Sequence, residues 1–129
     1  MLSFSFYPQN AEPGIPQTAE PDTLSVSEAH YERLARAGLA RLVPFEPYDL
    51  NVDDELCNGI KAVKLSFEMR RKLLDFLEAE RHKELLALFA ECGDIDSMES
   101  REKLEYVKLL TNLYERIKNE QNRYFSPVD

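Results

Sequence analysis

The sequence predicts a mainly α-helical fold built on a long antiparallel helical hairpin over residues 66–125. Three observations support this. Apolar residues recur with helical spacing in both halves of that segment, no glycine or proline interrupts residues 67–91, and residues 92–94 read as a tight turn. Around the hairpin we expect a short helix and an extended N-terminal segment with short β-structure. All of it fits a single domain over residues 1–129.

The first helix of the hairpin should present one apolar stripe. Successive residues advance by about 100° around a helix, and most large apolar residues of this stretch then fall on one side. Leu73 and Phe76 widen that side, and Gly93 is placed to end the helix. The stripe comprises Phe67, Leu74, Leu77, Leu85, Leu88, Phe89 and Cys92.

The second helix also carries an apolar face. Its first turn holds Glu99 and Glu102, which suit the positive end of the helix dipole. Two long helices joined by so short a turn must pack antiparallel. The face comprises Tyr106, Val107, Leu110, Leu113, Tyr114 and Ile117, with Tyr124 and Phe125 following.

Residues 1–26 are expected to form an extended arm, because four prolines and a glycine exclude a continuous helix. Phe4 and Phe6 share one face of an extended chain, so a short N-terminal strand is one interpretation. The alternating Leu24 and Val26 could pair with it. The arm either docks on the core or becomes ordered on a partner.

A short helix over residues 27–38 follows, with Ser25 or Ser27 as its N-cap and Gly38 ending it in a left-handed conformation.

Residues 39–65 should be extended or irregular, since Pro44 and Pro47 exclude a helix there. The segment from Ile60 to Phe67 alternates like a strand, but it could equally lead into the next helix.

Residues typical of catalytic and metal sites are sparse. Glu78 and His82 stand one helical turn apart, a spacing more typical of a solvated surface pair than of a metal site. Cys57 and Cys92 lack metal-binding spacing and read as free thiols in a reducing compartment. No phosphate loop, dinucleotide fingerprint or nucleophile elbow occurs. We therefore expect no enzymatic activity, no cofactor and no metal.

The acidity of the chain is unevenly distributed. The net charge is −8, and residues 1–56 carry ten acidic against three basic residues, whereas residues 57–129 are close to neutral. A negative field argues against direct nucleic-acid binding, because phosphate contacts need a surplus of lysine and arginine. No apolar run is long enough to span a membrane, and the N-terminus lacks the pattern of a secretion signal. We expect a cytoplasmic protein.

One concentration of basic residues stands out at the start of the predicted hairpin. It either meets phosphate or an acidic partner, or it pairs within the chain with the acidic block at residues 53–55. The closeness of that block in sequence favours pairing within the chain. The basic residues are Lys61, Lys64, Arg70, Arg71 and Lys72.

The first 38 residues contain a short motif of an aromatic strand, a proline–aspartate step and an alternating strand that leads into a helix. Its residues are Phe6-Tyr7-Pro8, Pro21-Asp22, Leu24-Ser25-Val26-Ser27-Glu28, Tyr31, Leu34 and Gly38. In these residues the chain resembles the N-terminal segment of phage tail-fibre assembly proteins. The resemblance covers residues 1–38 only, implies a phage or prophage setting and a binding role, and assigns no active residue.

These observations predict a non-catalytic protein that binds another protein, as an inhibitor, immunity protein or assembly chaperone of bacterial or phage origin. An acidic surface suits a basic partner. The alternative is a structural homo-oligomeric module, such as a homodimer in which hairpin stripes pair between subunits. Aromatic and acidic residues on the extended segments are the expected contacts. They are Tyr7, Phe45, Tyr48, Asp49, Asp53, Asp54 and Glu55.

Overall fold

The computed structural model of the protein describes residues 2–8, 22–52, 55–90 and 98–128. Within these ranges the chain forms five strands and two long helices, with short helical segments between the second and third strands. In chain order the elements are β1 (Leu2–Tyr7), β2 (Asp22–Val26), α1 (Glu28–Leu34), η1 (Ala35–Leu39), α2 (Ala40–Leu42), β3 (Glu46–Val52), β4 (Glu55–Lys64), α3 (Phe67–Ala90), α4 (Met98–Lys118) and β5 (Tyr124–Val128).

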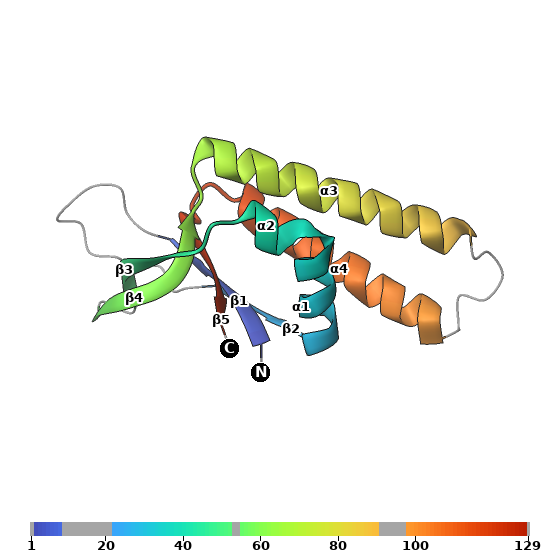
Figure 1. The fold of residues 1–129 in the computed structure, drawn as a ribbon, viewed down its shortest axis with the longest axis horizontal. Helices are drawn as coiled ribbons and strands as arrows, with labels where there is room; N and C mark the ends of the chain where they lie inside the picture. Colours follow the sequence, from blue (N-terminus) through green and yellow to red (C-terminus); the bar gives the residue numbers. More distant parts are fainter. Residues whose placement is uncertain (1, 9–21, 53–54, 91–97, 129) are drawn as a thin grey trace.

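The five strands form one antiparallel sheet in the order β2-β1-β5-β4-β3. The prediction of a mainly α-helical fold is therefore wrong. The protein is an α/β structure in which a helical hairpin packs on an antiparallel sheet. Strands β1 and β5 are neighbours, so the two ends of the chain lie close together (Figure 1). In the same view the α3–α4 hairpin and the β3–β4 ribbon extend in opposite directions from the centre of the sheet.

The arm expected over residues 1–26 contains two paired strands, β1 and β2. Phe4 and Phe6 are fully buried on one face, and Phe4 lies opposite Leu24 in the ladder. The interpretation of these residues as a strand, paired with the alternating Leu24–Val26 segment, is confirmed. Residues 9–21, with three of the four prolines, lie outside the described residues.

Residues 39–65 are not irregular, because most of them form the β3–β4 ribbon. Pro47 interrupts no ladder, since β3 is an edge strand and one of its sides needs no donor. The register shifts between Tyr48 and Leu50, and Gly59 adopts a φ of 70° that suits glycine. The strand interpretation of the segment after Ile60 is confirmed as far as Lys64.

The predicted short helix is longer than residues 27–38. Ser27 is its N-cap, as expected, and its side chain accepts a hydrogen bond from the backbone N–H of His30 (3.2 Å). Gly38 does have a positive φ, 133°, but it kinks the helical path instead of ending it. The segment η1 is a π-helical turn around Gly38, and helix resumes over α2.

The helical hairpin is confirmed, with different limits and one different face. It ends at Lys118, and the residues Tyr124–Val128 form a strand instead of more helix. On α3 the predicted stripe is wrong at both ends, where Phe67 is 80% and Phe89 69% exposed, while the polar Glu84 is buried. Cys92 and the predicted turn at residues 92–94 lie outside the described residues.

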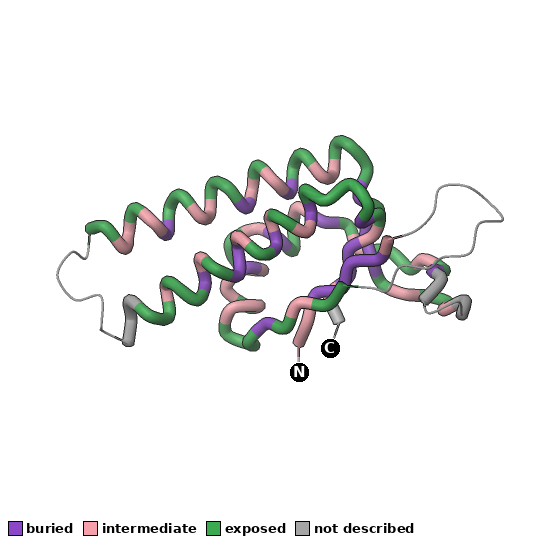
Figure 2. The backbone as a smooth tube through the Cα atoms, turned by 180° about the vertical axis from the view of Figure 1, so that it is seen from behind, coloured by how far each residue is buried: buried purple, intermediate pink, exposed green. Residues whose placement is uncertain are grey.

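The apolar face predicted for α4 is largely confirmed. Its buried residues join the side chains of β1, β4, β5 and α1 in the main core, and burial is densest in the sheet and the adjoining half of the hairpin (Figure 2). The buried residues of α4 are Tyr106, Leu109, Leu110, Leu113 and Ile117.

Candidate functional site

The two faces of the sheet are lined by different kinds of side chain. One face carries phenylalanines and packs on the helices. The opposite face carries a second, smaller cluster, to which no described helix residue belongs. We call this cluster the tyrosine face. Its members are Tyr7, Leu50 and Ala62, which are buried, and Tyr48, Ile60 and Tyr124, which are partly buried.

Strand register assembles the tyrosine face from both ends of the chain. Tyr7 on β1 lies opposite Tyr124 on β5, and Tyr48 on β3 lies opposite Ile60 on β4. Because side chains alternate along a strand, Tyr124 points away from the helices while its neighbour Phe125 points toward them. The rings of Tyr48 and Tyr124 meet with centroids 5.1 Å apart and planes at 59°.

The three tyrosines differ in what they can contact. Tyr7 is only 7% exposed, and its backbone carbonyl accepts a hydrogen bond from the N–H of Arg123 (3.0 Å). Burial raises the pKa of Tyr7 above its ordinary value, and burial followed by the nearby Glu46 does the same for the pKa of Tyr48. Both hydroxyls are therefore neutral near pH 7. The partly buried rings of Tyr48 and Tyr124 are the ones that offer surface.

Acidic residues border this face along β3. Glu46 and Asp49 are exposed, and the carboxylate of Asp49 accepts a hydrogen bond from the backbone N–H of Gly59 (3.1 Å). That bond fixes the position of one negative charge beside Tyr48. Asp53 and Asp54 lie outside the described residues, and Glu55 is described only as the first backbone position of β4.

Of the predicted contact residues, the structure brings Tyr7 and Tyr48 into one cluster, leaves Asp49 next to Tyr48 on β3, and separates Phe45 from them. Phe45 packs edge-on against Phe125 in the helix-covered core, with ring centroids 5.8 Å apart. Tyr124 was missed as a site residue because it was assigned to the helix. The run Tyr124-Phe125-Ser126 does not alternate between apolar and polar residues, so no local pattern marked the strand.

One of the basic residues at the start of the hairpin, Arg70, makes its contacts within the chain. Arg70 donates hydrogen bonds to the carbonyl oxygens of Asn119 (2.9 Å), Asn122 (2.8 Å) and Ile117 at the end of α4, and also to that of Leu65 (3.3 Å). Burial, and then the like charge of Arg123, lowers the pKa of Arg70. For Arg70 the structural interpretation is supported, and its described partners are backbone carbonyls in α4, in the segment that follows α4, and at Leu65.

A buried polar cluster joins α1 to the hairpin. Glu84 on α3 is 5% exposed and forms an ion pair with Arg33 of α1. The guanidinium of Arg33 also stacks over the ring of Tyr106, with its central carbon 4.2 Å from the ring centroid. Burial is the main cause that raises the pKa of Tyr106 to about 12. The ion pair and the stacked guanidinium thus join α1 to both helices of the hairpin.

Within the described ranges no three histidine, cysteine, aspartate or glutamate side chains gather as a metal site would require, and Cys57 is a free thiol. In the same part of the chain, no helix combines the length and the apolarity needed to cross a membrane. Comparison with protein-family models, with curated proteins and with solved structures found no match. The resemblance of residues 1–38 to phage tail-fibre assembly proteins stays a prediction.

Proposed function

We propose that this protein is a non-catalytic binding protein that holds a partner protein against its tyrosine face. The observation that carries the proposal is the pair of partly exposed rings, Tyr48 and Tyr124, in contact on the sheet face where the described members of the cluster all lie on strands. Tyrosine is enriched at protein interfaces, because a large rigid ring gives contact area at a low entropic cost. The buried Tyr7 lies opposite Tyr124 in the ladder and belongs to the same cluster.

The acidic border indicates the kind of partner. Glu46 and Asp49 flank the exposed rings, and the whole chain carries a net charge of −8. A partner with a basic patch would be attracted to this face, and complementary charge speeds association. An inhibitor, immunity protein or assembly chaperone of bacterial or phage origin acts through such a surface. The resemblance of residues 1–38 is the support for that setting.

The second candidate is a homo-oligomeric structural module. Leu86 and Leu104 are 56% and 38% exposed on the hairpin, which gives a second copy an apolar surface to cover. Light scattering over a range of concentrations separates the two proposals. A dimer that dissociates on dilution supports the module, and a monomer at all concentrations argues against it.

The proposed contact can be tested by site-specific photocrosslinking in cells of the source organism. We place p-benzoylphenylalanine at position 48, with position 82 as the matched control, since His82 is exposed on α3. A single partner should be captured from position 48 and not from position 82. Tyr48→Ala should then weaken binding of that partner at least tenfold, about 1.4 kcal/mol, whereas Tyr48→Phe and His82→Ala should not. Equal capture from both positions would contradict the proposal, as would enzymatic activity in the protein alone.

A further inference from the structure

The two edges of the sheet are protected to different degrees. Strand β3, at one edge, contains Pro47, a register irregularity after Tyr48, and the exposed charges Glu46 and Asp49. Proline, bulges and charge are the devices by which proteins prevent another strand from pairing with an edge. Strand β2, at the other edge, has none of them over residues 23–26.

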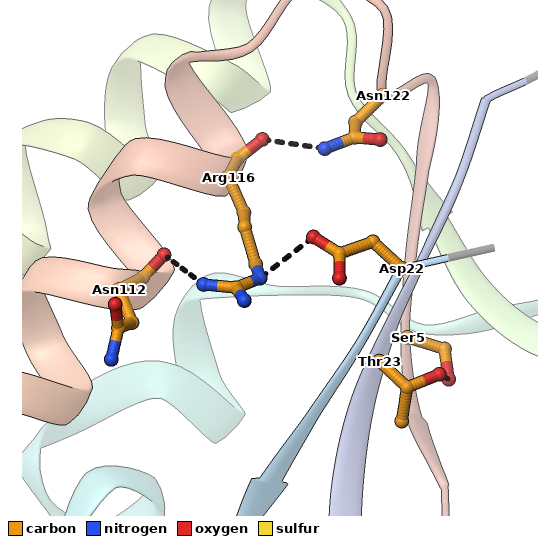
Figure 3. A network of polar contacts seen from close by, with 6 residues as sticks. All are labelled: Ser5, Asp22, Thr23, Asn112, Arg116 and Asn122. Carbon is orange, nitrogen blue, oxygen red and sulfur yellow. Dashed lines mark hydrogen bonds and ion pairs between the residues drawn. The ribbon is translucent and has the colours of Figure 1, made fainter.

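The single charged residue of β2 is turned inward. Asp22 forms an ion pair with Arg116 of α4, with Asp22 Oδ2 2.8 Å from Arg116 Nε (Figure 3). The pair ties the beginning of β2 to the last turns of the helix. Among the described residues no strand pairs with the outer side of β2, so every second residue there presents its N–H and C=O outward. Over residues 23–26 this side of β2 is a regular, uncharged edge about 13 Å long.

Hollows flank this edge. One, of about 340 Å³, lies between β2 and the side of α4 that carries Glu105, Lys108 and Asn112, and Leu24 and Leu109 contribute apolar surface to it. The other, of about 480 Å³, lies near the end of β2 and is lined by Leu2, Ser25, Val26, Ser27 and Glu28.

We call the outer edge of β2 and its two hollows the groove, and its chemistry indicates what can bind there. Asp22 is paired with Arg116 and Glu105 with Lys108 (3.5 Å), Glu28 lies beyond the end of β2, and residues 23–26 carry no charge, so a neutral segment matches this strand. Water hydrates the unpaired backbone groups of a free edge, and another extended backbone can replace that water along the whole row. Side chains of an added strand would alternate between apolar residues, toward Leu24, and small polar residues, toward Thr23 and Ser25 on the opposite face.

We propose that the outer edge of β2 is a docking groove for an extended, uncharged segment of a partner protein, which adds to the sheet as a sixth strand beside α4. The partner segment alternates apolar with hydroxyl-bearing residues. It binds through main-chain hydrogen bonds, and the hollows select its side chains. The inference rests on residues separate from the tyrosine face and does not depend on the proposed function.

The test uses the uncharged peptide acetyl-Gln-Thr-Val-Thr-Val-Thr-Gln-amide, added to isotopically labelled full-length protein and followed by NMR. Amide signals of residues 23–26 should shift, and at saturation their exchange with solvent should slow at least tenfold. The same peptide with proline at its central position lacks a backbone donor and should bind at least tenfold more weakly. Shifts confined to β3 or to the tyrosine face, or equal binding of both peptides, would overturn the proposal.

Two tryptophan variants locate the groove. Asn112→Trp places a large ring in the hollow beside β2 and should weaken peptide binding at least tenfold. Glu115→Trp is the matched control, because Glu115 is exposed on the same helix and does not line that hollow. Circular dichroism checks that both variants fold. Light scattering of the free protein then measures its oligomeric state. A dimer that Asn112→Trp dissociates would assign the edge to a second copy and overturn the partner segment.

Discussion

The two faces of the sheet are made from the same strands, yet they carry different chemistry. Toward the helices, Phe4, Phe6 and Phe125 are fully buried and their rings stack or tilt against one another at 5.1–5.3 Å. On the other face, Ser5 and Ser126 occupy the neighbouring positions, and the hydroxyl of Ser126 donates to the carbonyl of Lys61. One face thus supplies most of the hydrophobic stabilisation. The other face keeps hydroxyls and partly exposed rings, which suit binding.

The largest expected effect comes from the helix-covered face. Phe125→Ala removes the ring that contacts Phe4, Phe6 and Phe45, and should lower the free energy of unfolding by about 3–5 kcal/mol. Urea denaturation followed by circular dichroism measures it. Tyr124→Ala, one residue away on the other face, is the matched control and should cost less. Equal losses in the two variants would contradict the division of roles between the faces.

The second effect concerns pH and the buried ring of the hairpin. The pKa of Tyr106 is raised from its ordinary 10.0 to about 12, mainly by burial. Between these values the unfolded chain has lost the phenolic proton while the folded protein keeps it. The free energy of unfolding is therefore nearly unaffected by Tyr106 well below pH 10, and it falls by about 2 kcal/mol as pH rises from 10 to 12.

The variant Tyr106→Phe isolates this contribution, since it keeps the ring and removes the proton. The free energy of unfolding, measured from denaturation curves between pH 10 and 12, should lose most of its dependence on pH in this variant. Tyr48→Phe, on the opposite face and partly exposed, should keep most of it. A slope unchanged by Tyr106→Phe would show that other groups dominate alkaline unfolding.

How far the sequence could predict the fold depends on how local each signal is. The face of α4 was predictable, because its apolar residues repeat with helical period and its charges lie elsewhere. The face of α3 was not, because a core position holds Glu84, whose partner Arg33 lies 51 residues away. Strand β5 was missed for the same reason: it is short, and it is held by β1 at the other end of the chain.

The candidate site shows the same limit. Tyr48 and Asp49 were predictable as contacts, since aromatic and acidic residues stand together on an extended segment. Tyr124 could not be predicted as a residue of the candidate site, because its position there depends on strand pairing with Tyr7, which no local pattern encodes. Pro47 correctly excluded a helix, but it left open whether residues 39–65 are extended or irregular, because an edge strand accommodates a proline.

The smallest expected effect is a difference in stability between variants of two nearby aromatic residues, Phe45 just before β3 and Tyr48 on β3. Phe45 and Tyr48 are both partly buried and three residues apart, but Phe45 packs on the helix-covered core and Tyr48 on the tyrosine face. Phe45→Ala should therefore lower the free energy of unfolding by about 2 kcal/mol, and Tyr48→Ala by about 1 kcal/mol, measured by urea denaturation. If the protein binds its partner through the tyrosine face, the order reverses for binding, where Tyr48→Ala should be the more damaging. A Tyr48→Ala variant that loses more stability than Phe45→Ala would mean that the tyrosine face is primarily a second core.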